Sequence, residues 1–234
     1  MTGRTAQQKR GGTGGRPVKR RSAAARRRWA RYAGIALAVI AVTAALYGVF
    51  RTTNPAPTGT ASTGGTDATY PYAVGQPGPG QPAPGFTLAS TAGSQQSLTS
   101  LRGKTVLLYF QEGLMCQPCW DQISDLERNA AAVHTAGVDQ IISITTDPID
   151  LVTRKMQDLR LSTPVLSDPD LAVSKTYHAN EYGMMGTSRD GHTFILVRPD
   201  GTIAWRADYG GAPKYTMFVP TDRLLADLKA GATR

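Results

Sequence analysis

The sequence predicts an α/β domain, with a mixed central sheet and helices on both faces, preceded by one transmembrane helix. Two observations predict this class. After residue 85, short β-rich apolar runs alternate with stretches of helical periodicity. Before that region come a segment rich in Pro, Gly and Thr and, earlier still, an apolar run of nineteen residues without charge. We therefore expect four parts, with the bounds 1–31, 32–50, 51–84 and 85–232.

The first part, residues 1–31, is strongly basic. It carries eleven Lys or Arg and no acid, whereas the other 203 residues carry fifteen basic and seventeen acidic side chains. The net charge of +9 therefore belongs to this tail. A basic tail can bind nucleic acid, but this one runs directly into an apolar segment, which favours membrane orientation instead. We expect membrane lipid, and not nucleic acid, as a partner of the N-terminal region.

The second part, residues 32–50 (YAGIALAVIAVTAALYGVF), predicts a single transmembrane helix. Its length approaches the ~20 residues that a helix needs to cross the hydrocarbon core. Basic residues crowd its N-terminal side and only Arg51 follows closely, which predicts a cytoplasmic tail and an extracytoplasmic domain in the cell membrane. The alternatives are a cleaved signal peptide and a buried core helix. The long apolar run, the absence of a clear A-x-A site and the cationic flank favour the uncleaved anchor.

The third part, residues 51–84, consists mainly of Pro, Gly, Thr and Ala. Such a composition predicts a flexible to semi-extended tether that cannot build a core.

The fourth part begins with two predicted strands and a helix. Residues 86–89 form a short strand candidate, and 105–110 (TVLLYF) form the continuous apolar run that is typical of a buried central strand. Residues 116–136 predict a helix because their apolar side chains recur at helical spacing. Gly137 suits the end of that helix.

The middle of the domain repeats the strand and helix alternation. Residues 140–145 (QIISIT) predict a strand, and 148–159 predict a helix with Leu151, Met156 and Leu159 on one side. A short strand over 164–166 and a helix over 170–177 follow.

The last elements are a hairpin and a helix. Residues 193–197 and 202–207 predict two strands, because Asp200-Gly201 between them is a hairpin signal. Residues 222–229 predict the closing helix.

The chemistry centres on the chain's only two cysteines, in the segment Cys116-Gln117-Pro118-Cys119. Outside the cytosol such a pair can persist as a disulfide, but a bridge across two residues restrains the unfolded chain little, so stapling is the weaker interpretation. The pair lies at a predicted helix N-terminus, where free N–H groups and the helix dipole favour a thiolate. We therefore expect Cys116 to be the nucleophile and Cys119 the resolving thiol. Metal binding and a structural bridge are the alternatives.

These residues resemble the thioredoxin superfamily, in particular its redoxin or AhpC/TSA-type branch and the membrane-tethered TlpA-like thiol-disulfide oxidoreductases. The resemblance covers about residues 76–230. Segments 84–88 (PGFTL), 98–104 (LTSLRGK) and 194–201 (FILVRPDG) look like the family's first strand, the turn before its central strand and the strand after its active site. The resemblance implies a thioredoxin-like fold, a dithiol active site, and a disulfide or peroxide substrate.

The sequence departs from these relatives at two places. Thioredoxin-like reductases usually carry a cis-proline before the strand that faces the CxxC, and the corresponding residue here is His192. Peroxiredoxins carry Pro seven residues and Thr three residues before the peroxidatic cysteine. Counted from Cys116, those positions hold Tyr109 and Gly113, which argues against direct peroxide reduction.

His192 raises a second hypothesis. Sco-type copper chaperones bind copper through two cysteines and a distal His before a strand. The segment Asp190-Gly191-His192-Thr193 resembles theirs, although the cysteine spacing here is one residue shorter. Two thiolates and an imidazole suit copper, and Met184 and Met185 could add thioethers. The alternative interpretation is a partly buried imidazole that the backbone satisfies.

Three further features border the predicted site. Glu112 is a candidate proton relay to Cys119 or an ordinary solvated carboxylate. For Met184 and Met185 loop packing is the default interpretation, and Trp120 is expected to face the core or shield the sulfurs without a catalytic role. The segment Tyr209-Gly210-Gly211 with Pro213 predicts a loop, for which packing is the default interpretation and a place beside the site is the alternative.

We thus expect a membrane-anchored extracytoplasmic thiol-disulfide oxidoreductase whose site comprises Cys116, Cys119, His192 and Glu112. No nucleotide or other cofactor is implied, with copper on Cys116, Cys119 and His192 as the alternative. The expected partners are protein thiols or disulfides and a membrane electron donor.

Overall fold

The computed structural model describes residues 40–41 and 70–232. Ile40 and Ala41 are helical. The basic tail, nearly all of the predicted span 32–50 and the first part of the predicted linker lie outside the described residues. Within the described ranges no helix combines the length and the apolar character that crossing a membrane requires.

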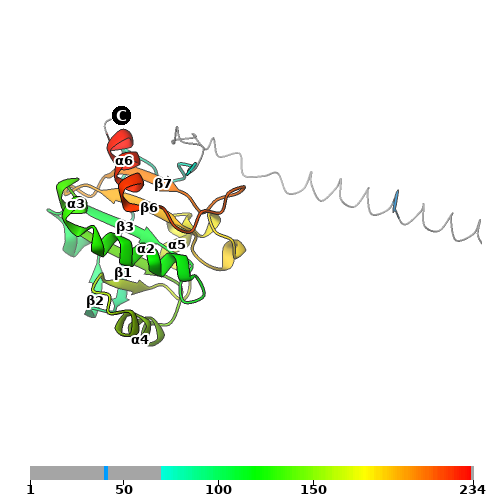
Figure 1. Ribbon diagram of the computed structural model, residues 1–234, viewed down its shortest axis with the longest axis horizontal. Coiled ribbons are helices and arrows are strands. Elements are labelled where there is room, and N and C mark those ends of the chain that lie inside the picture. The colour runs from blue at the N-terminus through cyan, green and yellow to red at the C-terminus, as the bar shows by residue number, and fades with distance from the viewer. Residues whose placement is uncertain (1–39, 42–69, 233–234) are drawn as a thin grey trace, which may run out of the picture. The chain divides into compact units, whose positions relative to one another are not determined.

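Seven strands form one sheet in the order β2-β1-β5-β4-β3-β6-β7 (Figure 1). The strands are β1 (Thr87–Ser90), β2 (Gly93–Ser97), β3 (Val106–Phe110), β4 (Gln140–Thr145), β5 (Val165–Ser167), β6 (Thr193–Val197) and β7 (Ile203–Asp208). β3, β4 and β5 run parallel, while β6 and β7 on one side and β1 and β2 on the other pair antiparallel. The predicted mixed sheet is confirmed.

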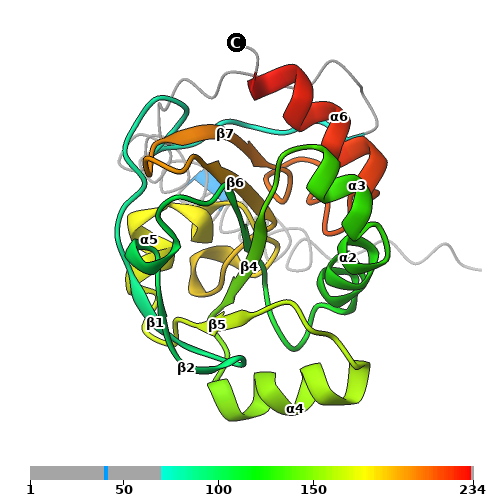
Figure 2. The same ribbon diagram turned by 90° about the vertical axis from the view of Figure 1, so that its left-hand side faces the viewer.

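Helices cover both faces of this sheet (Figure 2). They are α2 (Gln117–Arg128), α3 (Ala130–Thr135), α4 (Ile149–Leu159), α5 (Ala172–Thr176) and α6 (Thr221–Ala232), with the 3-10 turns η1 (Thr99–Leu101), η2 (Ala179–Glu181) and η3 (Gly186–Ser188). One apolar core contains side chains of α2, α3, α4 and α6 together with one face of the strands. A second core lies on the other face, under η1, α5 and η2.

β3 lies at the centre of the sheet, and all five of its residues are buried. Leu107 and Tyr109 contribute to the first core, whereas Val106, Leu108 and Phe110 contribute to the second, because successive side chains of a strand point to opposite faces. This two-sided burial explains the uninterrupted apolar run in the sequence. It also fixes the start of the loop over residues 111–116, which joins β3 to α2 and which we call the cysteine loop.

The predicted helix over 116–136 is two helices. Asn129 separates α2 from α3, and its side-chain amide donates to the backbone oxygen of Asp125 at 2.8 Å. Such local side-chain bonds compete with helix continuation, and apolar periodicity alone does not reveal them.

The folded domain begins before the predicted boundary at residue 85. Tyr72 is 6% exposed and packs edge-on against Trp205 and Tyr209. Ala73 forms a β-bridge with Asp208. Residues 70–84 are therefore part of the domain, and assigning all of 51–84 to a coreless tether was wrong for this stretch.

Candidate redox site

The two cysteines join the end of the cysteine loop to the first turn of α2. Cys116 is the N-cap residue, and its sulfur accepts a hydrogen bond from the amide of Cys119 at 3.3 Å. Pro118 lies in the first turn, where its missing N–H costs no helical bond. A disulfide links the two side chains. Cys116 is 6% exposed and Cys119 is fully buried, so an approaching group meets Cys116 first.

The loop between β3 and α2 is held in one conformation by Gly113 and Asp147. Gly113 has φ +91°, and a Cβ there would lie 1.8 Å from the Asp147 carboxylate. The same carboxylate accepts a bond from the amide of Leu114. Trp120, fully buried in the first core, donates its indole N–H to the carbonyl of Gly113 at 3.0 Å. The expectation that Trp120 faces the core is confirmed.

Glu112 is not the solvated carboxylate that one interpretation of the sequence proposed. It is 4% exposed, and its Oε1 accepts a hydrogen bond from the amide of Met184. The carbonyl of Glu112 accepts from Arg189, which also binds Asp147 at 2.8 Å. These bonds fasten the polar loop around η3 to the cysteine loop. Within the described residues, no hydrogen bond joins Glu112 to either cysteine.

Met184 and Met185 do not pack into the loop as expected. They are 58% and 51% exposed, and the backbone amide of Met184 donates to Glu112.

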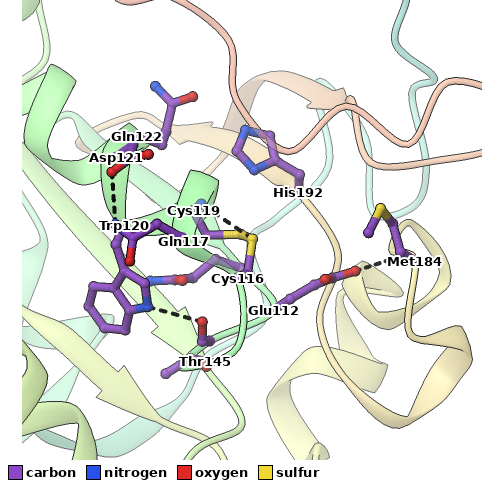
Figure 3. The surroundings of a disulfide bond; sticks show 12 residues. Glu112, Cys116, Gln117, Cys119, Trp120, Asp121, Gln122, Thr145, Met184 and His192 are labelled. Atoms are coloured by element: carbon purple, nitrogen blue, oxygen red, sulfur yellow. Dashed lines mark hydrogen bonds between the residues drawn. A yellow bond between two sulfur atoms is a disulfide. The ribbon is translucent and has the colours of Figure 1, made fainter.

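His192 lies immediately before β6, and its ring is near the disulfide (Figure 3). It is fully buried, and its Nδ1 lies 2.9 Å from the hydroxyl of Tyr109. That hydroxyl is also 3.4 Å from the carbonyl of Cys119. The ring partner is therefore a tyrosine of β3, and the interpretation of an imidazole satisfied by backbone was wrong. Nε2 has no hydrogen-bond partner among the described residues.

Burial keeps the side chains of His192 and Tyr109 uncharged. It lowers the pKa of His192 to about 3, because the imidazolium would lie in apolar surroundings. Burial, and secondarily the charge of Glu112, raises the pKa of Tyr109 well above its ordinary value. At neutral pH the two groups share one hydrogen bond without carrying charge.

Met217 completes the site, and the sequence offered little to identify it. It is 7% exposed and forms a small apolar cluster with Cys116 and Cys119. The expected loop after Tyr209 carries it there. Two bonds to α2 hold that loop: the amide of Val219 donates to Gln122 at 2.7 Å, and the amide of Thr221 donates to Asp125 at 2.9 Å.

Asp190, two residues before His192, is a second buried group that sequence reasoning did not single out. It is fully buried, and in the described part of the chain neither of its carboxyl oxygens has a hydrogen-bond partner. Burial raises its pKa well above the ordinary value, and the nearby charge of Asp168 adds to this. Asp168 itself accepts bonds from Ser174 and from the amide of Val173. Burial therefore favours the protonated, uncharged form of Asp190.

The donor atoms do not gather into a metal centre in this oxidised form. Across residues 40–41 and 70–232, no group of three or more His, Cys, Asp and Glu side chains is arranged to hold a metal ion.

Comparisons with known proteins point to one family. The model of the AhpC/TSA family matches residues 79–206. Peroxiredoxin Bcp of Escherichia coli is 33% identical over 127 residues, which are 53% of this chain and 81% of that protein. Peroxidoxin BcpB from Mycobacterium tuberculosis has the same fold, with a TM-score of 0.55 at 19% identity over 65% of this chain and 97% of that one. Enterococcus faecalis AhpC gives a TM-score of 0.54 at 15% identity over 65% and 90% of the two chains.

Proposed function

Because this chain belongs to the AhpC/TSA family of the thioredoxin-like superfamily, we propose that it is a thiol-disulfide oxidoreductase with Cys116 as nucleophile and Cys119 as resolving thiol. One observation carries the proposal: the disulfide bridges the N-cap and the first turn of α2, directly after a buried central strand. A helix N-terminus stabilises the thiolate that such exchange requires.

The reaction transfers two electrons and two protons between the cysteine pair and a substrate dithiol. A substrate thiolate attacks the sulfur of Cys116, which breaks the Cys116–Cys119 bond and forms a mixed disulfide. The second substrate thiol then attacks the substrate sulfur of this mixed disulfide. The substrate leaves as a disulfide and both cysteines become thiols. The reverse sequence reduces a substrate disulfide, and the reduction potential of the pair decides the direction.

The surrounding side chains support exchange at Cys116. Met217 and the fully buried position of Cys119 keep water and large groups away from the second sulfur. The Tyr109 hydroxyl, shared between His192 and the carbonyl of Cys119, positions the first turn of α2. Glu112 acts as a positioning residue through its bond to Met184.

Peroxide reduction is the second candidate, since the relatives carry the name peroxiredoxin. In that reaction a thiolate attacks the peroxide, releasing water or an alcohol and leaving a sulfenic acid, which the second cysteine converts to the disulfide and water. Neither cysteine has the Pro and Thr of the peroxiredoxin pattern: counted from Cys119, those positions hold Glu112 and Cys116. This absence favours thiol-disulfide exchange.

Cysteine variants test the assignment. We expect Cys116→Ser to abolish turnover of a disulfide substrate, whereas Cys119→Ser should accumulate a mixed disulfide that mass spectrometry detects. Full activity in either variant would exclude the redox role.

Two further measurements test the alternative functions. Hydrogen peroxide consumption by the reduced protein, faster than peptide disulfide reduction, would favour the peroxidase. Tight Cu(I) binding that His192→Ala weakens more than tenfold would favour copper delivery, for which Cys116, Cys119 and His192 are the proposed ligands.

We also propose that residues 32–50 anchor the chain in the cell membrane, with the redox domain extracytoplasmic. The support is the apolar run, the preceding basic tail and the Pro/Gly/Thr-rich segment that follows. The electrons would then come from, or pass to, a membrane protein. Protease added to intact cells should cleave within 52–69, and full protection of that segment would contradict the orientation.

A further inference from the structure

Exposed apolar side chains gather around the disulfide. Between residues 70 and 232, the exposed large apolar side chains are Met115, Leu151, Met184, Met185 and Tyr215. All except Leu151 lie on loops that border the cysteine pair. We call Met115, Met184, Met185 and Tyr215 the apolar rim.

Each member of the rim is linked to the site by a hydrogen bond or by its place in the chain. Met115, 82% exposed, directly precedes Cys116. Met184 donates its amide to Glu112 in the same loop and lies beside the site in Figure 3, and Met185 follows it. Tyr215, 44% exposed, is two residues from Met217, which belongs to the same apolar cluster as the two cysteines. Three separate loops that border the cysteine pair thus expose large apolar side chains.

The loops that carry the rim are held in place. Arg189 joins the loop of Met184 to Asp147 and to the carbonyl of Glu112. Gln122 and Asp125 fix the loop of Tyr215 to α2. Most other large apolar side chains of the domain are buried. The exposed methionines on these fixed loops therefore indicate a recognition surface.

The chemistry of the rim selects the class of partner. A peroxide or a small dithiol can reach the sulfur of Cys116 without covering side chains on three loops. Methionine is flexible and polarisable, and it therefore adapts to apolar partners of differing sequence. From these observations we infer that the apolar rim docks an extended polypeptide with apolar residues flanking its cysteines, and that such polypeptides are the substrates of Cys116–Cys119. This inference rests on the proposed thiol-disulfide exchange.

Rates with matched dithiols test the inference. The oxidised full-length chain, in lipid nanodiscs, reacts with two reduced two-cysteine peptides that differ only in having Leu and Val or Gln and Ser beside the cysteines. Dithiothreitol serves as the small dithiol. Mass spectrometry after alkylation measures how fast the Cys116–Cys119 disulfide is reduced. We expect the apolar peptide to react about tenfold faster than the polar one, as the burial of one or two apolar side chains predicts.

The variant Met185→Gln/Tyr215→Gln should remove most of this preference while its rate with dithiothreitol stays within about twofold of wild type. Leu151→Gln, on α4, is the matched control and should keep the preference. Equal rates with both peptides in the wild type, or a preference that survives in the double variant, would overturn docking at the rim but leave the exchange function intact. Failure of the wild type to oxidise any of the three dithiols would instead overturn the exchange function, and the docking inference with it.

Discussion

Two buried ionisable side chains, His192 and Asp190, are neutral for the same physical reason and affect stability in opposite directions. Burial disfavours the charged form of each, which lowers the pKa of the imidazole to about 3 and raises the pKa of the carboxyl. Between pH 6.5 and 3 the unfolded chain therefore holds a proton on His192 that the folded chain lacks. Above pH 4 the folded chain holds a proton on Asp190 that the unfolded chain has released.

These differences predict opposite pH slopes for two variants between pH 4.5 and 6.5. His192 makes the folded state more stable as pH rises, and Asp190 makes it less stable, so their effects oppose each other in the wild type. In His192→Asn the free energy of unfolding should fall as pH rises relative to wild type, by up to about 1.4 kcal/mol per pH unit. Asp190→Asn should shift the slope the other way. Urea unfolding at pH 4.5, 5.5 and 6.5 measures both, and slopes that match wild type would show that these groups are not held neutral.

At the residue scale, the sequence identifies the disulfide-bonded pair better than the partners of the side chains around it. Cys116 and Cys119 were predictable because spacing and position after a strand are local properties. The partner of His192 is Tyr109, 83 residues away, and that of Glu112 is the amide of Met184, 72 residues away. Such pairs depend on the register of the sheet and the course of the loops. Met217 is an ordinary methionine until the loop after β7 brings it to the sulfurs.

At the scale of elements, the loop from β3 to α2 determines where the cysteines lie. Its conformation requires Gly113 for two reasons: a positive φ, and the absence of room for a Cβ against Asp147. Gly103 has a similar φ of +86° but nothing within 4 Å of an added Cβ. Alanine substitutions at the two glycines therefore distinguish the cost of backbone strain from the cost of a steric clash.

We expect Gly103→Ala to lower the free energy of unfolding by about 1 kcal/mol, the backbone strain alone. Gly113→Ala should cost at least about 3 kcal/mol, because the Asp147 carboxylate must also move away from the amide of Leu114. It should also slow the reaction of Cys116 with a dithiol. Denaturant unfolding and alkylation kinetics measure the two effects, and equal losses for the two variants would contradict the packing at Gly113.

The pattern of apolar residues predicted the buried strands well, but it predicted the polar edge strand and the helix boundary at Asn129 poorly. The strands over 140–145 and 193–197 have the predicted bounds, because continuous apolar runs mark strands buried on both faces. β2 (GSQQS) was missed since it is a polar edge strand without alternation. The division between α2 and α3 was missed because it depends on a hydrogen bond of Asn129.

At the scale of the whole domain, residues 70–84 are part of the folded structure, although their Pro- and Gly-rich composition predicted a tether. Arg206, fully buried, pairs with Asp208 and donates to the carbonyls of Gln76 and Pro77. Asp208 in turn accepts from the amide of Gly75 at 2.7 Å. Buried charges need such partners, so this segment satisfies the ion pair at the edge of the sheet as well as covering Trp205.

A chain that starts at residue 70 should therefore fold with the stability of the full domain, whereas one that starts at residue 85 should not. Removing Tyr72 from the core costs about 3–5 kcal/mol by analogy with other aromatic truncations, and the Arg206 donors left unpaired add about 1–3 kcal/mol. Tyr72→Ala in the longer chain isolates the first contribution and should lie between the two. Urea unfolding of the three proteins measures the differences. If the chain from residue 85 were as stable as the chain from residue 70, residues 70–84 would be only a tether, and the packing of Tyr72 against Trp205 would contribute nothing to folding.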